Sequence, residues 1–183
     1  MNHTHHIILN ITKKNYDIIV SLISIAAMSL LCVYPFLYYR KLLVSHDITF
    51  HLFQSVQFYK SIMSGTLIPR WAMETNNGYG SANFIFYSPI SYYVICFFKL
   101  FMSSLILSMI SAICISYLLS GISMFFVIRG YVNTKIALLC ALLYQIFPFH
   151  MIDLYLRGAV AELFAFVWFP IIFKYLNEMF VSG

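Results

Sequence analysis

The sequence predicts an all-α protein, a polytopic bundle of transmembrane helices with amphipathic surface helices in its first extracytoplasmic loop. Two observations carry this prediction. Apolar residues make up 62% of the 183 residues, and only 9% are charged, against about 25% in soluble proteins. Long uncharged runs also separate the few charges. A water-soluble enzyme is therefore excluded, and the scattered basic residues form no patch that would bind nucleic acid.

Uncharged runs of membrane length mark the expected spans. The run over 18–39 has 22 residues, and such a helix is about 33 Å long, enough for the hydrocarbon core. A second run, over 100–128, has 29 residues. We expect transmembrane helices at 17–39, 103–128, 136–152 and 163–180. The other segments are expected to be a cytoplasmic tail at 1–16, a cytoplasmic loop at 129–135 and extracytoplasmic loops at 40–102 and 153–162.

The long loop over 40–102 is expected to contain surface or re-entrant helices. Ser45 is a candidate N-cap for a helix that ends before Gly65. Its apolar residues recur at helical spacing: Ile48, Leu52, Val56, Tyr59 and Met63. Its polar residues lie on another face: Asp47, His51, Gln54 and Ser55. This pattern predicts an amphipathic helix on the membrane surface.

The apolar run over 84–102 has two interpretations, because Pro89 lies near its start and Lys99 near its end. If it returns to its starting side, the chain has four spans and an N-terminus inside, with basic residues in the short cytoplasmic segments. If it crosses the membrane, seven basic residues lie inside in the opposite orientation, against four outside. Charge bias alone does not decide between these topologies.

Asp47 and His51 are the first candidate for chemistry. Residues four apart share a helix face, and these two follow shortly after the first span. A carboxylate there can act as a general base, or hold a divalent cation together with an imidazole. The simpler interpretation is that Asp47 stabilises the start of its helix and that the histidine is an interfacial polar residue.

Asp153, Arg157 and Glu162 form a second group of ionisable residues at the edge of an expected span. Arg157 can bind a phosphate through its planar guanidinium, or it can simply pair with Asp153 at i,i+4. Arg70 and Trp71 form a third group, close to the turn residues Gly78 and Gly80. They suit an interfacial anchor, and an exposed indole can also stack on a sugar ring.

Two segments together resemble a known group of proteins. These are "SHDITFHLFQSVQFYKSIMSGTLIPRWAMETNNGYGSANFIFYSPISYY" after the first span and "YLRGAVAELFAFVWFP" near the end. They resemble the N-terminal part of bacterial membrane proteins labelled 6-pyruvoyl-tetrahydropterin synthase-related, which are similar to the GT-C glycosyltransferase superfamily. The resemblance covers the chain from about Tyr16 onwards.

The resemblance implies transfer of a sugar from a polyprenyl-phosphate donor in the bacterial inner membrane, with the N-terminus in the cytoplasm. Asp47 is then the catalytic residue, with Mg²⁺ or Mn²⁺ as the implied cofactor and no ligand set identified. Other expected substrate-binding residues are His51, Arg70, Trp71, Arg157 and Glu162. The resemblance also implies that the segment beginning at Pro89 lies at the membrane without crossing it, which supports four spans.

This sequence departs from the superfamily in two respects. The first loop lacks the usual paired acids, because His46 precedes Asp47 and the next acid is Glu74. Relatives also have many more spans, so we expect a fragment or a reduced relative that is not active alone. The alternative hypothesis is a non-enzymatic membrane subunit that packs with another membrane protein. A transporter component is disfavoured by the uncharged spans.

Overall fold

The computed structural model describes the backbone of residues 2–182 and the side chains of residues 15–181. Within these residues the chain forms helices and no strand, apart from an isolated antiparallel bridge between Ala72 and Ser81, so the predicted all-α class is confirmed. The elements are α1 (Asn2–Tyr39), α2 (Ile48–Met63), η1 (Asn76–Gly78), α3 (Asn83–Phe86), α4 (Ile90–Lys99), α5 (Leu105–Arg129), α6 (Thr134–Gln145), α7 (Pro148–Ile152), η2 (Asp153–Arg157) and α8 (Val160–Ser182).

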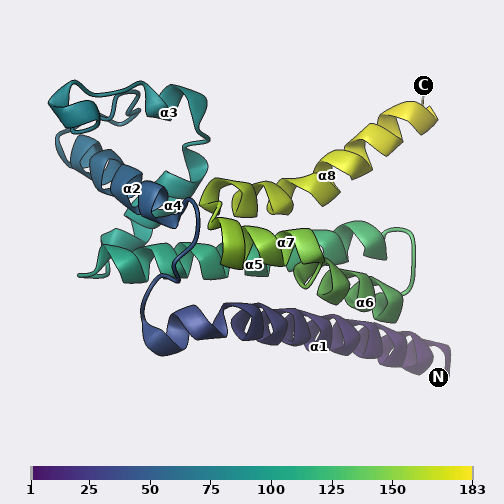
Figure 1. The fold of residues 1–183 in the computed structure, drawn as a ribbon. Coiled ribbons are helices and arrows are strands. Elements are labelled where there is room, and N and C mark those ends of the chain that lie inside the picture. The colour runs from purple at the N-terminus through teal and green to yellow at the C-terminus, as the bar shows by residue number, and fades with distance from the viewer. Residues whose placement is uncertain (1, 183) are drawn as a thin grey trace.

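Four stretches of the described chain are long and apolar enough to cross a membrane, which indicates an integral membrane protein. They are Asn15–Tyr39, Leu105–Arg129, Thr134–Arg157 and Val160–Val181. Both chain ends lie at one end of the bundle, and α2, α3 and α4 lie at the other (Figure 1). We call residues 40–104, which contain these three helices, the cap.

α5 is the central helix of the bundle. It packs against α1, α4, α6 and α8, and 50% of its apolar stretch is buried, against 28% in each of the other three. Small residues allow this close packing, because apolar surface alone does not bring helices together in lipid. At Gly121 a Cβ atom would lie 2.6 Å from Nε2 of Gln145 and 2.7 Å from Cγ2 of Ile25. α1 and α6 therefore both approach α5 at this glycine.

Hydrogen bonds inside the bundle reinforce this packing. The amide of Gln145 donates to Oγ of Ser29 at 2.6 Å and to the carbonyl of Tyr117 at 3.0 Å, so it joins α6 to α1 and α5. Tyr117 in turn donates to the carbonyl of His150 at 2.9 Å. Such bonds tie spans together where no water competes.

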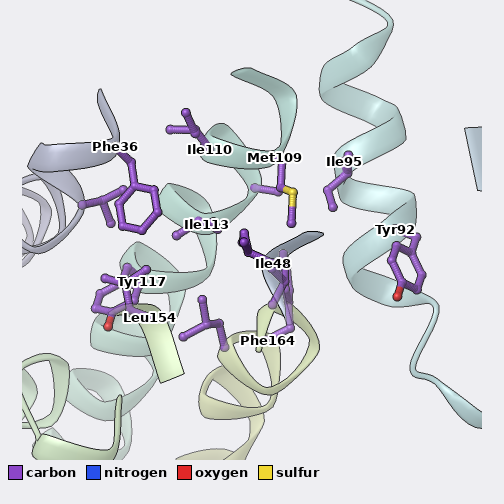
Figure 2. Close-up of a cluster of buried hydrophobic side chains, with 14 of the residues drawn as sticks. Phe36, Ile48, Tyr92, Ile95, Met109, Ile110, Ile113, Tyr117, Leu154 and Phe164 are labelled. Atoms are coloured by element: carbon purple, nitrogen blue, oxygen red, sulfur yellow. The ribbon is translucent and has the colours of Figure 1, made fainter. Parts of the chain in front are cut away.

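The main hydrophobic core lies where the cap meets the bundle. Figure 2 shows side chains from α1, α2, α4, α5, η2 and α8 gathered around it. Fully or nearly fully buried examples are Phe36, Ile48, Ile95, Met109, Ile113, Leu154 and Phe164. Because one core includes both parts, the cap and the bundle fold as a single unit.

The run over 84–102 contains no long helix. It is divided into α3 and α4 at Tyr87, Ser88 and Pro89, with Pro89 as the N-cap of α4. A helix of ten residues is about 15 Å long, half the thickness of the hydrocarbon core. α4 packs against α2 and α5, and it is not among the four long apolar stretches.

α2 begins later than predicted, and the predicted cap residue is wrong. Asp47, not Ser45, is the N-cap, and its side chain makes no capping bond. The expected solvent-facing side of α2 is also wrong, because His51, Gln54 and Ser55 are buried. For two of them neighbours supply partners, because Ser55 donates to the carbonyl of His51 and His51 bonds to Tyr92. Oε1 of Gln54 has no hydrogen-bond partner among the described residues.

The expected loop at 153–162 is mostly helical. α7 continues into the π-helical turn η2, and Gly158, in the left-handed conformation at φ 66°, ends that turn directly before α8. Asp153 is consequently fully buried at the end of a candidate span instead of lying in a loop. π-helical turns in α-helices are frequent at functional sites.

Candidate functional site

The start of α2 is held against the η2 turn by its backbone. The N–H of His46 donates to the carbonyl of Leu156 at 3.1 Å, and that of Asp47 donates to the carbonyl of Arg157 at 2.7 Å. These carbonyls are free because they end a helix. At Gly158 a Cβ atom would lie 2.2 Å from Oγ of Ser45 and 3.1 Å from the nitrogen of Ile48. Glycine at this position allows the two segments to touch.

This docking brings the backbone of Asp47 to that of Arg157, whose side chain belongs to an ion-paired group. Nη1 of Arg157 lies 2.7 Å from Oδ1 of Asp153 and 2.5 Å from Oε2 of Glu162, and Nη2 contacts Oε1 of Glu162. Asp153 is fully buried, whereas the Arg157 and Glu162 side chains are 33% and 44% exposed. We call Asp153, Arg157 and Glu162 the acidic cluster.

Arg157 is therefore engaged by carboxylates of its own chain. Of the two interpretations of the sequence, the i,i+4 pair with Asp153 is observed, and it is extended by the fork to Glu162. The cluster holds two carboxylates and one guanidinium. An incoming phosphate would have to displace Glu162 from Arg157, so the cluster as it stands favours a neutral ligand over an anion.

His51 lies between this cluster and the aromatic side chains of the cap. The residue is 2% exposed, its ring is in contact with Phe50 and Tyr87, and its Nδ1 lies 3.1 Å from the hydroxyl of Tyr92. Burial lowers the pKa of His51 to about 4, against the opposing effect of the Asp47 and Glu162 carboxylates. His51 is consequently a neutral imidazole at neutral pH.

The pKa of His51 predicts a pH dependence of stability. Between pH 6.5 and about 4 the unfolded chain takes up a proton at His51 and the folded chain does not. The stability present above pH 6.5 is therefore lost as the pH falls, by about 3 kcal/mol over the window. We expect this loss in SDS-unfolding titrations from mixed micelles.

The matched variants are His51→Gln and His46→Gln. His51→Gln should remove this part of the pH dependence. The His46→Gln variant should retain this pH dependence, because the His46 side chain is exposed. An unchanged pH dependence in His51→Gln would contradict the assignment.

Arg70 and Trp71 lie elsewhere in the cap. The Trp71 indole packs over Gly80, where a Cβ atom would lie 2.1 Å from its Nε1. Both residues line a groove of about 450 Å³ beside the second half of α2. Arg70 also lines a neighbouring groove with Tyr87, and Tyr87 contacts His51. The two predicted groups are thus separate sites, and aromatic side chains such as Tyr87 lie between them.

Glu74, the second acid of the first loop, has a structural role. It accepts hydrogen bonds from Lys60 at 2.5 Å and Gln57 at 2.6 Å, and its N–H donates to Gln57. These bonds lower the pKa of Glu74 and hold the 66–74 segment against α2. It does not join Asp47 as a paired acid.

The metal ion that the resemblance implies does not fit these residues. In the part of the chain whose side chains are described, no three His, Cys, Asp or Glu residues gather as a metal site. Asp47 and His51 thus lack a third ligand, and Glu162 is already engaged by Arg157. The acidic cluster can instead accept protons and hold polar groups.

The sequence predicted the neighbourhood of Asp47 and His51, and it separately predicted Arg157 and Glu162. It did not predict Tyr92, which bonds to His51, because nothing in the aromatic run Ser91-Tyr92-Tyr93 distinguishes its members. No protein-family model matches this chain, and no curated protein or solved structure does either. The proposals below consequently rest on the geometry and on the resemblance described above.

Proposed function

We propose that the chain is a glycosyltransferase-like module of the GT-C type, which transfers a sugar from a polyprenyl-phosphate donor. The single observation that carries this proposal is the docking of Asp47 onto the η2 turn, which gathers Asp47, His51, Arg157 and Glu162 from three segments. The gathered groups lie where the cap meets the bundle, so a lipid-linked donor can reach them from the membrane. The cap then faces the outside, and the N-terminus is cytoplasmic.

In this proposal Asp47 is the general base. The hydroxyl of the acceptor gives its proton to the Asp47 carboxylate as its oxygen bonds to the anomeric carbon of the sugar. The bond from that carbon to the phosphate oxygen breaks, and its electron pair stays on the lipid phosphate. Arg157 can stabilise the leaving phosphate only after its fork to Glu162 opens.

Asp47→Asn tests the base. We expect transfer by the full chain in liposomes to fall by about 10²–10⁴-fold, the usual contribution of a general base. The donor probe is undecaprenyl phosphate carrying ¹⁴C-labelled glucose or mannose. The acceptor probe is methyl glucoside, and the measurement is labelled disaccharide together with released undecaprenyl phosphate.

His46→Asn is the matched control, because His46 adjoins Asp47 and makes a similar backbone bond to η2 while its side chain is exposed. It should keep the wild-type rate. Equal rates for Asp47→Asn and the wild type would exclude Asp47 as the base. The enzymatic proposal requires the chain to be active alone, contrary to the expectation from its few spans, so absence of transfer by the wild-type chain would overturn it.

The second candidate function is a non-enzymatic membrane subunit that packs with another membrane protein. The neutralisation of Arg157 by Asp153 and Glu162 favours it, because this guanidinium is already paired and would have to leave a carboxylate to receive a lipid phosphate. The liposome assay separates the two, because a subunit of this kind gives no transfer with any donor.

A further inference from the structure

We propose that His51 and Asp47 form a paired donor and acceptor for one uncharged hydroxyl group, and that Tyr92 fixes the tautomer of His51 that this requires. The ligand class is a neutral polyol, such as an unphosphorylated sugar. The inference rests on the proposed function, since it specifies the acceptor side of the same site. It is argued from the hydrogen-bonding capacity of three side chains.

The first step concerns Tyr92. Its side chain is 1% exposed, and its only hydrogen-bond partner in the described residues is Nδ1 of His51 at 3.1 Å. Burial raises the pKa of Tyr92 well above its usual value, so the group stays a hydroxyl. A buried O–H with one available acceptor donates to that acceptor, because an unpaired buried donor is costly. Tyr92 therefore donates to Nδ1.

The second step concerns His51. An Nδ1 that accepts a hydrogen bond carries no proton, so in a neutral imidazole the ring proton is on Nε2. No group of the described residues bonds to Nε2, yet Nε2 is not one of the fully buried polar atoms without a partner, as Oε1 of Gln54 is. Nε2 therefore reaches the surface as an N–H donor. In this tautomer His51 donates and does not act as the base.

The third step concerns the surroundings of this donor. Asp47, the N-cap of α2, is four residues before His51, and its carboxylate is close enough to act electrostatically on the ring. The groups that face the ring are Asp47, Glu162, Tyr87 and Tyr92, from four different segments. An N–H donor beside a carboxylate acceptor complements a hydroxyl, which accepts one hydrogen bond and donates another.

Charge distinguishes this hydroxyl from an anionic ligand. Asp47 and Glu162 both act electrostatically on His51, and the guanidinium of Arg157 is already paired. A phosphate or carboxylate at Nε2 would lie close to two carboxylates of like charge. The pair should consequently bind methyl glucoside in preference to glucose 6-phosphate.

The tautomer is measured directly by ¹⁵N NMR of histidine-labelled full chain in lipid bilayers. His51 is assigned by comparison with His51→Gln. We expect the wild type to show a protonated Nε2 and an unprotonated Nδ1. In Tyr92→Phe, His51 should show a mixture of the two tautomers or the opposite tautomer. The matched control is Tyr93→Phe, because Tyr93 donates to the carbonyl of Leu67 and not to His51. A wild-type proton on Nδ1, or an unchanged ring in Tyr92→Phe, would overturn the inference.

Binding is measured on the same samples and needs no turnover. Methyl glucoside should shift the His51 Nε2 resonance, and glucose 6-phosphate at the same concentration should not. The shift should disappear in Asp47→Ala. Equal shifts with both sugars, or no shift with either, would overturn the hydroxyl pair. Failure of the glycosyltransferase proposal alone would instead give these shifts without any transfer of label in liposomes.

Discussion

Replacing Arg157 with methionine is expected to lower the free energy of unfolding by about 3–5 kcal/mol, the usual cost of removing one partner of a buried ion pair. Asp153 is fully buried. Among the described residues its Oδ2 has no hydrogen-bond partner, and its Oδ1 forms an ion pair with Arg157. Without that partner an uncompensated carboxylate remains at the end of a candidate span. Such a charge is costly in low-dielectric surroundings.

Unfolding by SDS from mixed micelles measures this loss. Lys60→Met is the matched control, because it removes the exposed pair with Glu74, whose side chains are 57% and 53% exposed. Pairs of that kind contribute about 0–1 kcal/mol. Asp153→Asn combined with Arg157→Met should recover part of the loss, since the buried charge is then gone. A loss for Arg157→Met no larger than that for Lys60→Met would contradict the role assigned to the pair.

Replacing Gly158 with alanine is expected to cost about 2–5 kcal/mol. The left-handed conformation at φ 66° costs a residue with a side chain about 1–2 kcal/mol. The added Cβ would also lie 2.2 Å from Oγ of Ser45 and 3.0 Å from Cβ of Ile48, and crowding of that kind costs about 1–3 kcal/mol. Relief of the crowding separates the start of α2 from η2.

Gly65→Ala separates the two costs. Gly65 also has a positive φ, of 93°, but a Cβ there would meet nothing within 4 Å. It should therefore show the backbone cost alone. Ser45→Ala should restore part of the stability of Gly158→Ala, because it removes the nearest obstructing atom. Hydrogen exchange at the amides of His46 and Asp47 should rise in Gly158→Ala and stay unchanged in Gly65→Ala. Equal effects of the two glycine substitutions would show that the close contact is unimportant.

The spans were predictable because the bilayer imposes a length and a composition on any helix that crosses it. Which face of α2 is buried was not predictable. Hydrophobic periodicity assumes that water receives the polar face, but His51, Gln54 and Ser55 of α2 are buried against other helices. Partners distant in the sequence reduce the cost of burying polar groups, as Tyr92 does for His51. No local pattern in α2 reveals such partners.

The candidate site was predictable in pieces and not as a whole. Spacing alone placed Asp47 beside His51 and Arg157 beside Asp153. Nothing in the spacing joined these pairs, because they are held together by backbone bonds from His46 and Asp47, which leave no residue-specific signature. Gly158 is the exception, because a glycine between Arg157 and the next apolar run is typical of a helix end.

The two backbone bonds from the cap to η2 also determine when the site is completed during synthesis. The donors, on His46 and Asp47, are made early, whereas the acceptors, on Leu156 and Arg157, are made near the end of the described chain. At ordinary elongation rates the interval is about ten seconds. During that time the N–H groups of His46 and Asp47 have no carbonyls of Leu156 and Arg157 to bond to. The site is therefore complete only after synthesis has reached α8. A ribosome stalled before η2 would leave the cap without its backbone bonds to that turn.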